Sequence, residues 1–260
     1  MCARRTRVGS QRTIMVSGET IPPEINLAIR IKRAMSEDQV RREFNRWADE
    51  GRGRGMEEGH WEITRLTIEL MGVRQEDNIF DLGCGSGWAS RVLAGMAPKG
   101  VIVGADLADH MIREAVVEYP NPPNTFFLVA DAAGIPCRDA FFDSLLSVES
   151  IYYYPDLATT FGEVCRILRP GGCAYLLINY FKENPYSHVW SKYLNIPVHL
   201  LGGDDYKSLL RRAGFSEVSH RQISDPTPIP DDFKPSRWHP SRKDLEAFQA
   251  AGALLLIAKK

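Results

Sequence analysis

Three kinds of feature are scarce in this chain of 260 residues, and each scarcity excludes a class of protein. No apolar run approaches the roughly 18 residues of a membrane-spanning helix. The five cysteines are odd in number and form no C-x-x-C pair, which argues against a disulfide framework or a metal site and fits a reducing cytoplasm. The formal net charge is -1, so no overall field attracts nucleic acid or an anionic membrane.

The composition is otherwise that of a globular protein with a large core, because 44% of the residues are hydrophobic and 25% are charged. Residues 1–35 are predicted to be a flexible basic tail, with no acid before Glu19 and no central apolar block of a secretory signal. Translation could also start at Met15. Residues 36–260 are expected to form one domain whose oligomeric state the sequence leaves open.

The first part of that domain has the pattern of two helices. Ser36 and Gln39 resemble a capping box, and the apolar residues that follow recur at helical spacing, at Val40, Phe44 and Trp47. The glycines of "GRGRG" (51–55) are expected to break the chain and act as a mobile hinge. A second helix then runs to Gly72. We interpret residues 36–72 as an N-terminal helical lid.

From Asn78 onward, short apolar runs alternate with helical segments. This alternation predicts an α/β fold with a doubly wound, mostly parallel sheet covered on both faces. The final two runs, 216–223 and 253–260, suit an antiparallel pair, with no obvious helix between them. The predicted strands before them lie at 78–83, 101–107, 125–131, 142–148 and 173–180, and the predicted helices lie at 88–96, 109–119 and 156–168.

Two segments do not fit the repeating pattern and are interpreted as insertions that cover the substrate site. The first spans residues 181–203 and is rich in aromatic residues. The second spans residues 224–248 and contains five prolines, a density that forbids a central strand and resists a helix.

The stretch "IFDLGCGSG" (79–87) has the residues of a ligand-binding loop at the end of a strand. Its glycines follow G-x-G-x-G spacing, whereas a dinucleotide fingerprint requires G-x-G-x-x-G. Asp81 adds a carboxylate, which would repel a pyrophosphate but would favour a cation. S-adenosylmethionine carries a sulfonium and an ammonium group and no phosphate, so it is the better electrostatic match.

This loop resembles the first motif of the class I S-adenosylmethionine-dependent methyltransferases, and the resemblance extends from about Arg42 to Lys260. It implies a Rossmann-like, seven-stranded sheet with an antiparallel last strand. The motif order is most similar to the ubiquinone/menaquinone C-methyltransferase group. Asp81, Asp106 and Asp131 are spaced 25 residues apart (106 − 81 and 131 − 106), as successive strand ends in a βα repeat would be.

The resemblance also implies the residues that bind the cofactor. Asp106 is expected to bind the ribose hydroxyls, and Asp131 with the amide of Ala132 to bind the adenine edge. One departure from the family is Ala108, where a hydroxyl residue is frequent. The implied cofactor-binding residues are Asp81, Gly83, Cys84, Gly85, Gly87, Asp106, Leu107, Met111, Asp131, Ala132 and Ser147.

The catalytic residues are less defined, because methyl transfer mainly requires alignment of a nucleophile with the methyl carbon. Glu149, after the fourth core strand, either acts in catalysis or holds the cofactor's amino group. Tyr152, His60 and His188 are the other candidates, and each has a structural alternative. Trp61, Tyr153, Tyr154, Tyr186 and Trp190 could line the same pocket.

The sequence thus predicts methyl transfer to a small, apolar or aromatic metabolite in an enclosed pocket, without a metal. No basic stripe and no "NPPY" motif point to a nucleic-acid substrate. A protein methyltransferase, or a non-catalytic binding protein on the same scaffold, are the alternatives. The atom that accepts the methyl group does not follow from the sequence.

Overall fold

The computed structural model describes residues 15–16, 19–20 and 23–260, with side chains from Ser36 onward except that of Arg54. Much of the predicted tail therefore lies outside the described residues. Its last part does not match the prediction, because helix α1 (Pro23–Asp49) begins before Ser36. Two short strands, β1 (Met15–Val16) and β2 (Glu19–Thr20), precede α1 and pair with each other.

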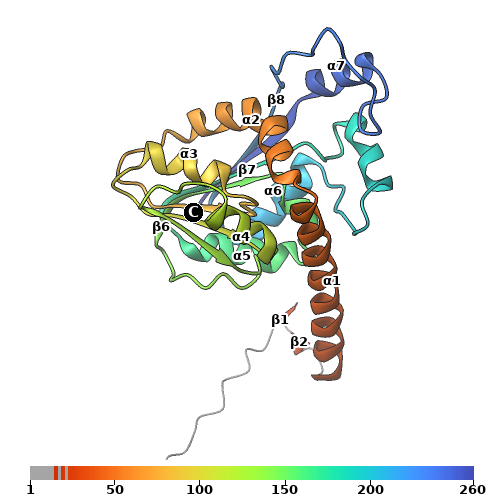
Figure 1. Ribbon diagram of the computed structural model, residues 1–260. Helices are drawn as coiled ribbons and strands as arrows, with labels where there is room; N and C mark the ends of the chain where they lie inside the picture. Colours follow the sequence, from red (N-terminus) through yellow and green to blue (C-terminus); the bar gives the residue numbers. More distant parts are fainter. Residues whose placement is uncertain (1–14, 17–18, 21–22) are drawn as a thin grey trace, which may run out of the picture.

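One seven-stranded sheet forms the centre of the molecule (Figure 1). Its spatial order is β5-β4-β3-β6-β7-β9-β8, and β9 alone runs against its neighbours. The chain moves outward from β3 to β5 and then returns to β6 on the other side of β3, so the strand order switches between β3 and β6. The strands are β3 (Ile79–Leu82), β4 (Ile102–Asp106), β5 (Thr125–Val129), β6 (Phe142–Val148), β7 (Leu168–Ile178), β8 (Glu217–Ile223) and β9 (Ala253–Lys259). The predicted fold class is confirmed.

Helices cover both faces of the sheet (Figure 1). Alternate strand residues point to opposite faces. Ile79 packs with residues of α2 and α3, whereas the next residue, Phe80, packs with those of α5 and α6. The helices are α2 (Arg52–Met71), α3 (Trp88–Met96), α4 (Asp109–Val117), α5 (Leu157–Ile167), α6 (Gly203–Arg212) and α7 (Arg242–Ala251), with short 3₁₀ helices η1 (Ile151–Tyr153) and η2 (Pro185–Lys192). Among the described helices, none has the length and apolar character needed to cross a bilayer.

The break between α1 and α2 is shorter than predicted. Gly51 has a φ of 69°, in the left-handed region that favours glycine, and the chain turns there. Gly53 and Gly55 lie inside α2 instead of in a loop. A helix tolerates glycine at a cost of about 1 kcal/mol each. Gly53 also leaves room for the Glu114 carboxylate, whose Oε1 would be 2.6 Å from an added Cβ.

The second predicted insertion contains a helix that the sequence did not reveal. Helix α7 connects β8 to β9 and begins directly after the last proline, Pro240. Ser241 caps it, because the Ser241 Oγ accepts a hydrogen bond from the amide of Asp244 at 3.1 Å. The prolines therefore prevent regular structure only in the loop before α7.

Candidate active site

A cavity lies at the carboxyl ends of β3, β4 and β6, beside the switch in strand order. The two N-terminal helices close it from the other side. Its lining combines a cluster of carboxylates with apolar side chains. The lining includes Val40, Phe44, Met56, His60, Asp81, Gly83, Cys84, Gly85, Asp106, Leu107, Met111, Asp131, Ala132, Glu149, Tyr153 and Tyr154.

The three loop glycines have different roles. All have positive φ, but a Cβ at Gly83 would clash with Ser150 at 2.5 Å, and a Cβ at Gly87 with Phe127 at 2.5 Å. A Cβ at Gly85 would meet no atom within 4 Å, because this residue faces the cavity. Gly87 does not line the cavity, so we assign it to helix packing at the start of α3 and not to the predicted ligand contact.

Asp81 is a buried carboxyl group at the end of β3. Its Oδ2 accepts a hydrogen bond from the Ser90 hydroxyl at 2.6 Å. Burial raises its pKa from 3.8 to about 6, and the nearby Asp106 adds to this effect. A cation in the cavity would relieve the unfavourable burial of this negative charge.

Asp106 ends β4 and is oriented by the backbone. Its Oδ2 accepts from the Gly85 amide at 3.0 Å, and its Oδ1 accepts from the Ala108 amide at 2.8 Å. Burial raises its pKa. An ionised carboxylate has about four acceptor sites, so Asp106 retains acceptor capacity for a diol. Ala108 itself is the N-cap of α4 and makes no side-chain cap.

The remaining predicted cofactor residues divide into two groups. Cys84, Leu107, Met111, Asp131 and Ala132 line the cavity. Ser147 does not, because its Oγ points to the Ser150 Oγ at 2.5 Å. Ser150 in turn donates to the Leu82 carbonyl at 3.2 Å. Ser147 therefore supports the loop after β6 from behind and is not placed to bind the cofactor.

Glu149 follows β6 in a left-handed conformation that is uncommon outside glycine, with a φ of 54°. Its carboxylate is buried but lines the cavity. Oε1 accepts from the Asn179 amide at 2.5 Å, and Oε2 accepts from the Tyr152 hydroxyl at 2.9 Å. Burial raises the pKa of Glu149, whereas the charge of His60 lowers it. Tyr152 itself lies behind Glu149 and not in the cavity lining.

His60 of α2 lines the cavity opposite the strand ends. Its Nδ1 is 2.7 Å from the Met56 carbonyl oxygen, which can only accept a hydrogen bond. Nδ1 must therefore carry a proton. The neighbouring Trp61 does not line the cavity and makes an edge contact with Trp88 at 6.3 Å.

The first insertion does not supply the residues predicted from it. His188 donates through Nε2 to the Phe181 carbonyl at 3.0 Å, and neither it, Tyr186 nor Trp190 lines the cavity. Trp190 packs instead on Phe248 of α7, with ring centroids 5.5 Å apart. The insertion still supports the site from outside, because the amide of His199 donates to the Tyr152 carbonyl at 2.9 Å.

The apolar wall of the cavity comes from the N-terminal helices. Val40 and Phe44 of α1 and Met56 of α2 line it. The Phe44 ring makes an edge contact with the cavity-lining Tyr153, at 4.8 Å between centroids. The sequence showed Val40 and Phe44 as an apolar helical face, but such a pattern does not reveal what the face contacts.

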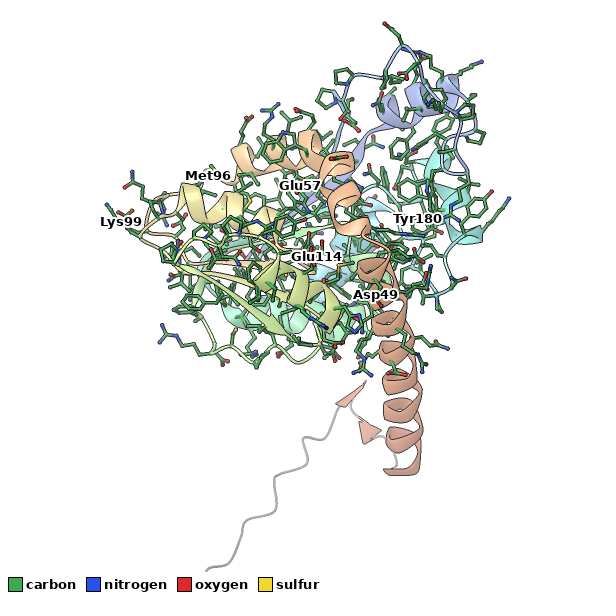
Figure 2. The ribbon with its side chains drawn as sticks, viewed as in Figure 1. Asp49, Glu57, Met96, Lys99, Glu114 and Tyr180 are labelled. Atoms are coloured by element: carbon green, nitrogen blue, oxygen red, sulfur yellow. The ribbon has the colours of Figure 1, made fainter. Side chains whose placement is uncertain are left out.

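Polar contacts connect the end of α1 to the start of α4. The Asn45 side chain donates to Asp109 at 2.8 Å and accepts from the His110 amide at 3.1 Å. His110 Nδ1 is 2.8 Å from Asp49 Oδ1. Asp49 and Glu114 lie beside one another across this junction (Figure 2). Within the described residues, no group of three or more His, Cys, Asp or Glu side chains could hold a metal ion.

The cavity therefore fits S-adenosylmethionine. Gly85 leaves the cavity surface open to a ligand. Asp81 places a negative charge in the cavity, which favours a cation, and Asp106 retains acceptor capacity for a diol. Fold and site together define a Rossmann-like protein that binds a cationic nucleoside cofactor.

Comparison with known proteins identifies the family. The profile of the methyltransferase domain matches residues 80–176. O-methyltransferase cnsE of Penicillium expansum is 31% identical over 182 residues, which are 66% of this chain and 63% of that protein. O-methyltransferase rstn1 of Aspergillus nomiae is 29% identical over 196 residues, which are 72% of this chain and 85% of that protein. This chain thus spans less than two thirds of the first relative.

A solved structure supports the same family. It is a complex between the Haloferax volcanii Trm112 methyltransferase activator and a methyltransferase; the matched chain is 32% identical, with a TM-score of 0.76 over 84% of this chain and 97% of that one. The protein belongs to the class I S-adenosylmethionine-dependent methyltransferases, and S-adenosylmethionine is its cofactor. The resemblance to the quinone C-methyltransferase group within this family stays a prediction.

Proposed function

We propose that this protein transfers the methyl group of S-adenosylmethionine to a small, apolar or aromatic metabolite. The observation that supports this most is the composition of the cavity. Carboxylates, glycines and Tyr153 line the side at the strand ends, and Val40, Phe44 and Met56 line the side at the N-terminal helices. A pocket with apolar walls and a few polar groups suits a small molecule.

The residues around the cavity have separate tasks in this proposal. The bound cofactor supplies an electrophilic methyl group on a sulfonium. Asp81 holds its positive charge, Asp106 the ribose, and Asp131 with Ala132 the adenine. Phe44 and Tyr153 exclude water and orient the acceptor for in-line attack. Oxygen is the acceptor atom that we favour, because cnsE and rstn1 are both named O-methyltransferases.

Calorimetry with S-adenosylmethionine tests the cofactor assignment. We expect Asp106→Ala to weaken binding by about 1–3 kcal/mol, which is the loss expected for charge-assisted hydrogen bonds. Asp225→Ala is a matched control, because Asp225 Oδ1 accepts from the Thr227 amide two residues on, as Asp106 accepts from Ala108, but lies outside the cavity lining. Tight binding of NAD with none of S-adenosylmethionine would contradict the assignment.

Mass spectrometry of products then tests the transfer. The wild-type protein, labelled cofactor and a panel of phenols, alcohols, amines, thiols and peptides should yield a methylated small molecule. Methylation of peptides alone would favour a protein methyltransferase. Cofactor binding without any methylated product across the panel would favour a non-catalytic binding protein.

A further inference from the structure

His60 is held in one tautomer by the helix that carries it. Because the Met56 carbonyl can only accept, the proton of a neutral His60 ring resides on Nδ1. Nε2 then has a free lone pair. The bond to Met56 is the one hydrogen bond that the His60 ring makes to a described residue. The ring therefore presents an unprotonated nitrogen in a cavity that is otherwise rich in acids.

Glu149 provides the complementary charge. Its two oxygens are held by Asn179 and Tyr152, so its position is determined independently of His60. The two side chains line the same cavity. They interact electrostatically, because His60 lowers the pKa of Glu149.

We infer that His60 is the general base of the reaction and that the acceptor is a hydroxyl group. This inference rests on the proposed methyl transfer. The acceptor O–H bond breaks and its proton moves to His60 Nε2. The oxygen electron pair forms the bond to the methyl carbon. The electron pair of the broken sulfur–carbon bond stays on sulfur, and the imidazolium later returns its proton to water.

The other ionisable groups at the cavity are less suited to this role. Burial raises the pKa of Cys84, Tyr153 and Tyr154, so these groups stay protonated. Arg41 is a permanent cation. The remaining carboxyl groups are Glu37 at α1, Asp81, Asp106 and Asp131 at the strand ends, and Glu149. Asp81, Asp106 and Asp131 are on the side assigned to the cofactor, and both oxygens of Glu149 already accept hydrogen bonds.

The first test needs no acceptor. In ¹⁵N NMR of the full-length protein above neutral pH, the His60 ring should show a protonated Nδ1 and an unprotonated Nε2, and the signal should be assigned by its loss in His60→Asn. A ring protonated at Nε2 instead would overturn the inference.

The second test is kinetic and uses a series of phenols of increasing acidity, from 4-methylphenol to 4-nitrophenol. We expect His60→Asn to reduce turnover of weakly acidic phenols by about 10²–10⁴-fold. The defect should shrink for 4-nitrophenol and at high pH, because an ionised phenol needs no base. His60→Gln should behave alike. His188→Asn is the matched control, because His188 also donates to a backbone carbonyl but lies outside the cavity lining.

Glu149→Gln separates the two roles. If His60 is the base, the rise of kcat/KM with pH should persist in Glu149→Gln and disappear in His60→Asn. If Glu149 is the base, the rise should disappear in Glu149→Gln and persist in His60→Asn, which would overturn the inference.

Failure of the proposed methyl transfer would be seen in the wild-type protein, before any variant is compared. In that case wild-type protein would bind no S-adenosylmethionine or methylate nothing. Wild-type protein that methylates only amines, thiols or ring carbons, or whose phenol turnover is unchanged in His60→Asn, would overturn the assignment of base and acceptor alone.

Discussion

The lid predicted at residues 36–72 and the insertions predicted at 181–203 and 224–248 were expected to enclose the active site, and only the lid lines the cavity. The helical cover (residues 36–61) contributes Val40, Phe44, Met56 and His60 to the lining. The aromatic lobe (residues 185–193 and 237–248) contributes no residue to it. The lobe is richer in aromatic side chains than the cover, so aromatic content alone did not indicate which region lines the cavity.

The difference lies in what the aromatic rings contact. In the cover, Phe44 packs on Tyr153 next to the strand ends, and Trp47 packs with Ala108 and Met111 at the start of α4. In the lobe, the rings pack on one another: Trp190 with Phe248 at 5.5 Å, and Tyr193 with Trp238 at 5.6 Å. The lobe therefore has its own small core, which stabilises η2 and α7 without forming a wall of the site.

The sharpest test of this comparison truncates one ring from each region. Phe44→Ala should raise the KM of the acceptor by roughly ten- to hundredfold, because burial of a phenyl ring contributes about 1.5–3 kcal/mol. Trp238→Ala should lower the melting temperature but leave that KM unchanged. Steady-state kinetics and thermal unfolding of both variants measure this. A larger KM effect in Trp238→Ala than in Phe44→Ala would show that the acceptor lies toward the lobe.

A smaller effect should appear in the pH dependence of cofactor binding. Asp81 has a pKa of about 6, raised by burial from 3.8. The cationic cofactor favours the ionised form, so affinity should rise about tenfold between about pH 5 and 8 as Asp81 ionises. Without cofactor the sign reverses: the folded state binds more protons between about pH 4 and 6, and the free energy of unfolding falls as pH rises through this range.

Two variants attribute that pH dependence to Asp81. Asp81→Asn should bind the cofactor weakly and with little change between pH 5 and 8. Ser90→Ala removes the hydroxyl that donates to the Asp81 carboxylate, so the rise in affinity should move to higher pH. Calorimetry at several pH values measures both. An affinity rise that persists in Asp81→Asn would assign it to Asp106, whose pKa burial also raises.

The sequence predicted the parts of the molecule that depend on local pattern. Strand periodicity predicted the sheet, the glycine loop with its carboxylate indicated Asp81 and Gly85, and the family resemblance implied Asp106; all three residues line the cavity. The sequence did not predict where individual side chains near the site point. Tyr152 and Ser147 were near the site in sequence but point behind it, toward Glu149 and Ser150. The tautomer of His60 depends on a hydrogen bond within α2, which no residue pattern reveals.

The smallest effect concerns the turn between α1 and α2, which lies inside the cover. Gly51 has a φ of 69°, whereas Gly55 is in the helix with no atom within 4 Å of an added Cβ. Gly51→Ala should lower the free energy of unfolding by about 1 kcal/mol, because alanine disfavours the left-handed conformation. Gly55→Ala should raise it by up to about 1 kcal/mol, because alanine has the higher helix propensity.

The same pair of variants tests whether the cover closes on the ligand. We expect hydrogen exchange in residues 36–61 to slow when S-adenosylhomocysteine is added. Since Gly51 is the residue at the turn between α1 and α2, Gly51→Ala should change the extent of slowing and Gly55→Ala should not. Slowing confined to the glycine loop at 83–87 would mean that the cover is a static wall. Equal effects of both substitutions on stability would show that the fold does not require a left-handed conformation at residue 51.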